Sequence, residues 1–206
     1  MNDFNRVAPL YDFLSGIVFG KTLINAQTHF LNRIQPNSEV LIIGGGTGKI
    51  LKKFDELSIP LSITYIEKST KMLSMSQSIV PFKNLKVDFV LGDENLIGTR
   101  SFDVIFTAFY LDVFNEQNLT TVVSTLSQVL RNKGSWIMTD FINTSRLWQR
   151  LLLNIMYQFF RFTTNLEGDK LLCFEDYLRG QKFAKVEKEN FYYGMIESAI
   201  YHKESH

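Results

Sequence analysis

Four glycines occupy five successive positions in the segment VLIIGGGTGKIL, which runs from position 40 to position 51. They are Gly44, Gly45, Gly46 and Gly48. Glycine at this density costs conformational entropy on folding, which indicates that something must approach the backbone closely here. The apolar run before the glycines predicts a strand, and the residues after them predict a helix. Such a turn lets a ligand touch the backbone beside the N–H groups of the helix N-terminus.

Spacing separates the chemistries that use a glycine loop. A P-loop would need a glycine at position 43 and Ser or Thr at position 50, but this chain has Ile43 and Ile50. The dinucleotide fingerprint requires a third glycine where Lys49 stands. The remaining Gly-x-Gly-x-Gly pattern over 44–48 is also compatible with a tight turn that binds nothing. The loop alone therefore leaves its ligand open.

Acidic residues that end the next two apolar runs narrow the choice. Glu67 ends LSITYIE, nineteen positions after Gly48, where a carboxylate can accept hydrogen bonds from both hydroxyls of a ribose. Asp93 ends LKVDFVLGD, where a carboxylate can accept from the amine of an adenine. Taken singly, Glu67 also fits a helix cap and Asp93 also fits an ordinary turn. Together with the glycines, the two acids indicate a nucleoside pocket without a phosphate clamp.

Short apolar runs alternate with amphipathic segments from about position 39 onward, and this alternation predicts the fold. It is typical of an α/β fold with a doubly wound, mostly parallel sheet and helices on both faces. Ser69 is expected to cap a helix, and the helix at 116–132 is expected to end at Lys133-Gly134. The expected strands are 39–44, 61–67, 85–93, 101–111 and 134–141, and the other expected helix is 48–57.

Both ends of the chain depart from this alternation. Helices are expected before the first strand, and a long apolar helix at about 145–163 precedes a short one at 174–181. The tail predicts two strands with a turn near 192–194, which should pair antiparallel as a hairpin at the sheet edge. We expect a single domain over 1–206, with a helical cap (1–35), a core (39–141), a helical lid (145–181) and a hairpin (183–203).

The composition excludes several other classes of protein. Hydrophobic residues make up 45% and charged residues 21% of the 206 positions, as in ordinary globular proteins. The net charge is +1 without a long basic run, so no nucleic-acid partner is expected. The lone Cys173 allows no internal disulfide and argues against a thiolate metal cluster, and no metal site is expected. Arg150 and Arg161 interrupt the apolar segment, and the N-terminus does not resemble a signal peptide, which indicates a cytoplasmic protein without a membrane span.

The same segments resemble the motifs of class I S-adenosylmethionine-dependent methyltransferases. VLIIGGGTG is similar to the first motif of that family, YIEKSTKML to its second-strand motif and LGDEN to its adenine-contact motif. SFDVIFTAFYLDVF resembles the fourth-strand motif, and VLRNKGSWIMTDF the helix and strand after it. FNRVAPLYDFLSG and the general layout are similar to the ubiquinone/menaquinone biosynthesis methyltransferase group. The resemblance covers most of the chain and implies a seven-stranded, Rossmann-like sheet with an antiparallel last strand.

This resemblance implies S-adenosylmethionine as the cofactor and gives roles to residues by position. The chain departs from the family at Ile42, where members usually carry Asp or Glu near the amino group of the cofactor. A charge-assisted hydrogen bond of about 1–3 kcal/mol is thereby lost. The positions implied to contact the cofactor are Gly44, Gly45, Gly46, Gly48, Glu67, Lys68, Met72, Asp93, Glu94, Thr107, Ala108 and, covering it, Tyr11.

The reaction expected from the resemblance is methyl transfer to a small, apolar or aromatic acceptor, by in-line attack on the methyl group of the sulfonium. Asp112 is a candidate general base and His29 a second one, although each also fits a structural role. The acceptor pocket is expected between the aromatic N-terminal segment, which includes Phe19, and the helix at 145–163. The broad apolar face of that helix suits packing on the sheet, a lid or peripheral contact with a membrane.

Two other functions remain open from the sequence. A catalytically silent member of the family, which binds the cofactor or a protein partner, is favoured by Ile42. An NAD-dependent reductase is disfavoured by the absent third glycine and by Asp93. The sequence TAFY lacks the paired prolines of enzymes that methylate nucleic-acid bases, which supports a small-molecule acceptor. The identity of the acceptor and the oligomeric state are not determined by the sequence.

Overall fold

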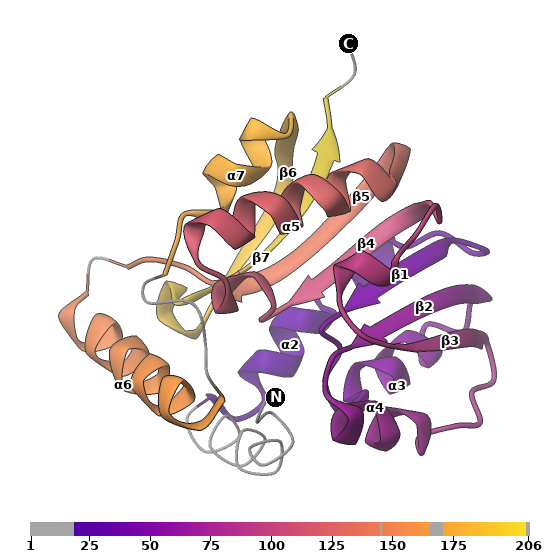
Figure 1. Cartoon of the computed structure of the whole chain (residues 1–206), viewed down its shortest axis with the longest axis horizontal. Helices are drawn as coiled ribbons and strands as arrows, with labels where there is room; N and C mark the ends of the chain where they lie inside the picture. Colours follow the sequence, from indigo (N-terminus) through magenta and orange to yellow (C-terminus); the bar gives the residue numbers. More distant parts are fainter. Residues whose placement is uncertain (1–18, 145, 165–170, 205–206) are drawn as a thin grey trace.

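The computed structural model describes residues 19–144, 146–164 and 171–204, and of residues 156–164 only the backbone. Its sheet has seven strands in the order β3-β2-β1-β4-β5-β7-β6 (Figure 1). β7 pairs antiparallel with both of its neighbours, and the other neighbouring pairs are parallel. The predicted doubly wound, Rossmann-like fold with an antiparallel last strand is confirmed. The strands are β1 (Glu39–Ile43), β2 (Leu61–Glu67), β3 (Leu85–Leu91), β4 (Phe102–Ala108), β5 (Leu130–Phe141), β6 (Phe183–Phe191) and β7 (Ile196–Lys203).

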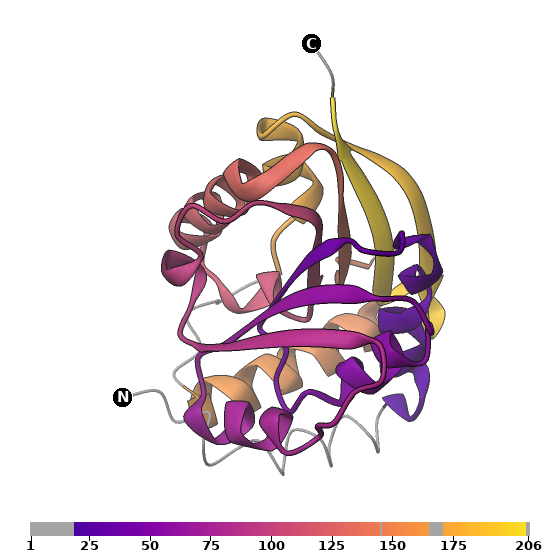
Figure 2. The ribbon, with the colours of Figure 1, turned by 90° about the vertical axis from the view of Figure 1, so that its right-hand side faces the viewer.

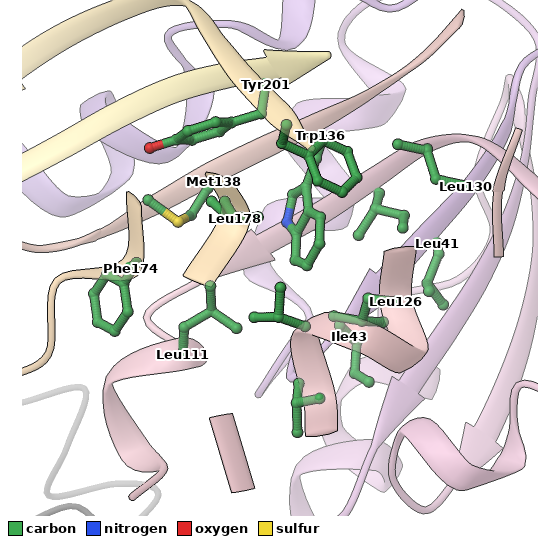
Figure 3. Packing of buried hydrophobic residues seen from close by; sticks show 14 of the residues in the cluster. Leu41, Ile43, Leu111, Leu126, Leu130, Trp136, Met138, Phe174, Leu178 and Tyr201 are labelled. Atoms are coloured by element: carbon green, nitrogen blue, oxygen red, sulfur yellow. The ribbon is translucent and has the colours of Figure 1, made fainter. Parts of the chain in front are cut away.

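The helices form two layers, one on each face of the sheet (Figure 2). On one face, α5 and α7 cover a core that contains Trp136 and Leu178 (Figure 3). On the other face, α2, α3 and α4 cover a core that contains Phe54 and Leu73. Strands of a parallel sheet that is buried on both faces read as continuous apolar runs, which explains the sequence of β1. The helices of the layers are α2 (Thr22–Thr28), α3 (Lys49–Asp55), α4 (Thr70–Gln77), α5 (Glu116–Val129) and α7 (Phe174–Gly180).

One further helix, α6 (Leu147–Thr164), lies outside these two layers. Figure 1 shows it at the periphery of the molecule, away from α5 and α7. Across the part of the chain that the structure describes, no helix is long and apolar enough to cross a membrane. Four short 3-10 turns complete the described chain: η1 (Leu31–Arg33), η2 (Glu94–Leu96), η3 (Leu111–Val113) and η4 (Tyr192–Gly194).

The boundary between α5 and β5 differs from the prediction. The helix ends at Val129 instead of reaching position 132, and the strand begins at Leu130 instead of Gly134. Leu130 pairs with Phe102 of β4 and is buried, so tertiary packing draws it into the sheet. Lys133, with φ of 66°, then takes up an irregularity in the register before the pairing resumes. The local signal at Lys133-Gly134 therefore marks a bulge within a strand and not a helix end.

The second half of the sheet follows the prediction more closely. β6 and β7 form the expected antiparallel hairpin, and their turn is the 3-10 turn at Tyr192–Gly194.

β4 is shorter than predicted: it ends at Ala108 and not at Leu111. The next residue, Phe109, has φ of 51°, which a strand cannot accommodate. The chain therefore leaves the sheet at Phe109 and turns across its carboxyl edge.

Candidate functional site

The glycine loop joins β1 to α3 in a conformation that needs glycine. Gly44, Gly46 and Gly48 have φ of 67°, 64° and 80°, in the left-handed region that other residues rarely adopt. A Cβ at Gly44 would lie 2.3 Å from the ring of Tyr110, and one at Gly48 would lie 2.5 Å from Ser76. A Cβ at Gly46, in contrast, would meet nothing within 4 Å. The protein itself therefore excludes side chains at two of these glycines, while Gly46 is open for the approach of a ligand.

Glu67 fixes this loop from the end of β2. The backbone N–H of Gly46 donates to Oε2 of Glu67 at 2.9 Å, and the N–H of Ser69 donates to Oε1 at 2.8 Å. The hydroxyl of Tyr65 donates to the carbonyl of Gly46 at 2.9 Å, which holds the loop from a second side. Burial raises the pKa of Glu67 despite these hydrogen bonds. Each carboxylate oxygen still has a second lone pair, so Glu67 can accept hydroxyl donors while it braces the loop.

Asp93 occupies the loop after β3, and it has the turn role that the sequence also allowed. Its Oδ1 accepts from the backbone N–H of Asn95 at 3.2 Å and from Asn95 Nδ2 at 3.0 Å. Lys68 Nζ lies 3.3 Å from its Oδ2. Burial raises the pKa of Asp93, but the bonds from Asn95 and Lys68 outweigh it and lower the pKa overall. Asp93 thus stays ionised at the edge of the site, with Lys68 linking the ends of β2 and β3.

Tyr110 is a site residue that the sequence analysis missed. Its hydroxyl donates to Oε2 of Glu94 at 2.9 Å, and its ring lies against Gly44 and 5.2 Å from the ring of Phe114. Burial and the charge of Glu94 raise the pKa of the phenol well above its usual value. The side chain therefore spans from the end of β4 to the loop after β3, across the glycine loop. The sequence placed Tyr110 inside the predicted strand 101–111, so the aromatic pair Phe109-Tyr110 near the end of that run was the signal available.

The other predicted residues at the end of β4 divide between the core and the site. The hydroxyl of Thr107 accepts from Trp136 Nε1 at 2.9 Å and is fully buried, so this side chain belongs to the core beneath α5. Ala108 is half-buried at the last position of the strand. On β2's side, the N–H of Met72 donates to the hydroxyl of Ser69, which caps α4 as predicted.

Asp112 lies on η3, beside a second acid that the sequence analysis did not single out. Asp140, at the end of β5, accepts from the N–H of Leu111 at 3.1 Å and from the N–H of Phe141 at 2.9 Å. Burial raises the pKa of Asp112 to about 7. Burial and the charge of Asp112 raise the pKa of Asp140 well above its usual value. The carboxyl ends of β4 and β5 thus hold two neighbouring buried carboxyl groups, and ionisation of one makes ionisation of the other less favourable.

The remaining positions from the sequence analysis have separate outcomes. His29 follows α2, with its ring 4.6 Å from Phe30 and 5.5 Å from Phe191 of β6, and these ring contacts agree with the structural role that the sequence also allowed. Tyr11 lies outside the described residues. Over residues 19–144, 146–164 and 171–204, no group of three or more His, Cys, Asp or Glu could hold a metal ion. Ile42 is fully buried in the core with Phe54, as an apolar residue in a central strand should be.

A chain of aromatic rings lies next to the polar site, at the ends of β5 and β7. The ring of Phe109 is 5.0 Å from that of Phe141, which is 5.5 Å from Phe19, and Phe19 is 4.6 Å from Tyr192. Leu153 of α6 belongs to the same cluster. Phe19 before α2, the ends of β5 and β7, and Leu153 of α6 therefore pack together in one buried cluster, and the acceptor pocket expected between these segments stays a prediction.

Comparisons with known proteins agree with this geometry. A family described as Methyltransferase domain matches residues 40–134, from β1 into β5. The demethylmenaquinone methyltransferase of Thermotoga maritima is 30% identical over 158 residues, which cover 71% of this chain. The chain spans 64% of the length of that curated relative.

Solved structures share the fold over most of the chain. A chain of the complex between the Haloferax volcanii Trm112 methyltransferase activator and a methyltransferase superimposes with a TM-score of 0.74, at 11% identity over 100% of this chain and 99% of that one. An S-adenosylmethionine-dependent methyltransferase from Clostridium acetobutylicum gives 0.67, at 13% identity over 98% and 99%. Human N-acetylserotonin methyltransferase in complex with SAM gives 0.64, at 14% identity over 88% and 52%. These solved structures show the fold, while the matched Methyltransferase domain and the curated relative support a class I methyltransferase, a class that takes S-adenosylmethionine as its cofactor.

Proposed function

We propose that the protein transfers a methyl group from S-adenosylmethionine to a small apolar or aromatic acceptor. One observation carries this proposal: the open side of Gly46, the carboxylate of Glu67 and the ring of Tyr110 meet at the carboxyl ends of adjacent strands. Ligands of open parallel sheets bind at the carboxyl edge beside the point where the order of the strands reverses. In this sheet that point lies between β1 and β4, because β2 and β3 extend to one side and β4 and β5 to the other. The residues present therefore fit a nucleoside cofactor.

The cofactor-binding roles follow from this arrangement. Gly46 brings the backbone close to the ligand, and Glu67 receives the ribose hydroxyls on the lone pairs that the loop leaves available. Tyr110, held in place by Glu94, offers its ring to the adenine, and Asp93 offers a carboxylate to the adenine amine. Lys68, Met72 and Ala108 line the remaining sides. Thr107 contributes through its backbone only, because its side chain is fully buried in the core, where its hydroxyl accepts from Trp136.

The aromatic cluster at the ends of β5 and β7 supports the class of acceptor. Phe109, which belongs to this cluster, lies between Ala108 and Tyr110 in the chain, so the apolar side chains adjoin the polar cofactor site. Phe141 and Phe19 continue it toward α6. Phe19 and Phe141 are buried within the cluster, so its partly exposed rings, Phe109 and Tyr192, are the ones that would pack against an apolar or aromatic acceptor and keep water from the reacting groups. A charged or strongly polar acceptor would lose its hydration there without compensation.

Asp112 is the candidate for the general base. S-adenosylmethionine supplies the methyl group on a positively charged sulfur, which is electrophilic without help from the protein. The remaining tasks are to align the acceptor and to take up its proton if it is a hydroxyl or an amine. A carboxyl group with a pKa of about 7 accepts a proton near neutral pH more readily than an ordinary aspartate does.

Calorimetric titration of the purified chain with S-adenosylmethionine, and with NAD as a control, tests the cofactor. We expect micromolar binding of S-adenosylmethionine alone. Glu67→Gln should weaken that binding about tenfold or more, because one acceptor of the ribose and of the loop is replaced by a donor. Glu56→Gln, at an exposed acid of similar type next to α3, is the matched control and should bind like the wild type. Equal affinities of the two variants would contradict the role of Glu67.

A catalytically silent cofactor-binding protein is the second candidate. Ile42 favours it, since the core position that carries an acid in the family is apolar here. A chain of the Haloferax volcanii complex, which contains a methyltransferase activator, shares this fold, and a protein partner is part of this second proposal. Labelled methyl transfer to a panel of phenols, quinols and amines separates the candidates. Cofactor binding without transfer to any of them, alone or with a partner protein, would favour the silent member.

A further inference from the structure

The outward side of α6 exposes a row of large apolar side chains. Leu147, Leu151 and Ile155 are 80%, 61% and 58% exposed, and Trp148 is 46% exposed. At 3.6 residues per turn, these four positions fall within an arc of about 100° on the helix. Soluble proteins expose single apolar side chains commonly, but a continuous row marks a surface that contacts something.

The opposite side of α6 holds the helix on the protein. Gln149 is fully buried, and its Nε2 donates to the carbonyl of Tyr193 at 3.0 Å. Leu153 is buried in the aromatic cluster. The apolar row therefore faces away from the rest of the described fold, and Tyr193, whose ring lies 5.9 Å from that of Trp148, extends it onto η4.

Charge identifies the surface that this row suits. Residues 141–166 contain three arginines and no acid, whereas the rest of the chain carries two more acidic than basic residues. Arg146, directly before α6, and Arg150, within it, are exposed on one flank of the apolar row, and the N–H of Arg150 donates to the carbonyl of Arg146 at 3.2 Å. Apolar and tryptophan side chains on one face with arginines beside them are the arrangement of a helix that lies in a bilayer interface.

We propose that α6 docks the protein peripherally on an anionic lipid surface. Leu147, Trp148, Leu151 and Ile155 enter the boundary between headgroups and acyl chains, while Arg146 and Arg150 meet the lipid phosphates. Leu153 on the inner side of the same helix belongs to the aromatic cluster, so docking brings that cluster close to the lipid surface. An acceptor dissolved in the lipid phase then reaches the protein without crossing water.

Flotation of the full chain with vesicles tests the docking. We expect binding to vesicles of equal parts phosphatidylglycerol and phosphatidylcholine, and about tenfold weaker binding to phosphatidylcholine alone. The chain has two tryptophans and Trp136 is fully buried, so a blue shift of the fluorescence on binding reports on Trp148. The assay needs no cofactor, and its outcome is therefore independent of the proposed methyl transfer.

Matched variants decide whether α6 is the docking element. Leu151→Glu should weaken vesicle binding about tenfold or more, and the double change Arg146→Gln with Arg150→Gln should remove the preference for anionic lipid. Val186→Glu, at a 48% exposed apolar residue on β6, should bind like the wild type. Absence of vesicle binding, or equal losses for Leu151→Glu and Val186→Glu, would overturn the proposal. So would a dimer in light scattering that Leu151→Glu converts to a monomer, because α6 would then be a contact between copies of the chain.

Discussion

At the ends of β3, β2, β1 and β4 the chain presents backbone N–H groups, carboxylates and a phenol, whereas at the ends of β5 and β7 it presents phenylalanines. The polar half is held by hydrogen bonds of fixed direction, such as Gly46 N–H to Glu67 and Tyr110 to Glu94. The apolar half is held by ring contacts, such as Phe109 with Phe141. Directional bonds define one ligand orientation, while packing accepts a range of apolar shapes.

This difference suits a protein with one constant ligand and one ligand that varies within a family. The polar half coincides with the segment that matches the methyltransferase domain, residues 40–134. The apolar half includes α6 and the hairpin, which lie beyond that match. We infer that the polar half recognises the cofactor and that the apolar half recognises the acceptor.

The largest expected effect comes from the glycine loop of the polar half. Gly48→Ala forces a Cβ to within 2.8 Å of the Ser76 Cα in a left-handed conformation, so the free energy of unfolding should fall by about 3 kcal/mol. Gly46→Ala has open space around its Cβ, so it should cost only about 1 kcal/mol. Chemical denaturation measures both values.

Cofactor titration of the same two variants sharpens the test. Gly46→Ala should abolish measurable binding of S-adenosylmethionine although it remains folded, because the new methyl group points into the ligand space. Unchanged affinity of this variant would show that the open side of the loop does not face the cofactor, and the polar half would lose its assigned role.

Asp112, where the two halves meet, provides the next effect. Its pKa is raised from 3.8 to about 7 by burial, so the stability that it contributes is complete below about pH 4 and is lost as the pH rises to about 7. At pH 8, the free energy of unfolding of Asp112→Asn should therefore be about 2–4 kcal/mol higher than that of the wild type. At pH 4 the two free energies should be equal. Denaturation at pH 4, 6 and 8 measures this difference. Parallel pH profiles of the two proteins would place the titration on Asp140 instead.

The smallest expected effect is a change in cofactor affinity when the hydroxyl of Tyr110, in the polar half, is removed, compared with removal of the exposed hydroxyl of Tyr193. Tyr110→Phe removes the hydrogen bond to Glu94 but keeps the ring, so the affinity for S-adenosylmethionine should fall about three- to tenfold. Tyr193→Phe, in the exposed turn of the apolar half, should leave that affinity unchanged. Calorimetry of both variants provides the comparison, and an equal response would mean that Glu94 does not fix the ring for the cofactor.

Local signals in the sequence determined most of the fold and the position of the polar residues. The bounds of β2 and β6 match the predicted runs, Ser69 caps α4, and the hairpin turns at Tyr192–Gly194, because alternation, caps and turns act over a few residues. Glu67 and the glycines could be placed for the same reason, since a strand end and the following turn are adjacent in the chain.

Tertiary structure alone decided the features that join distant segments. Asp140 meets the N–H of Leu111, and Trp136 claims the hydroxyl of Thr107, only because β4 and β5 pair side by side. Leu130 joins a strand against the local helix signal because the core buries it there. Each of the two hydrogen-bonded pairs is separated by 29 positions in the sequence, and Leu130 has a local preference for the helix. Burial and strand pairing are properties of the whole fold, and they determine the roles of these residues.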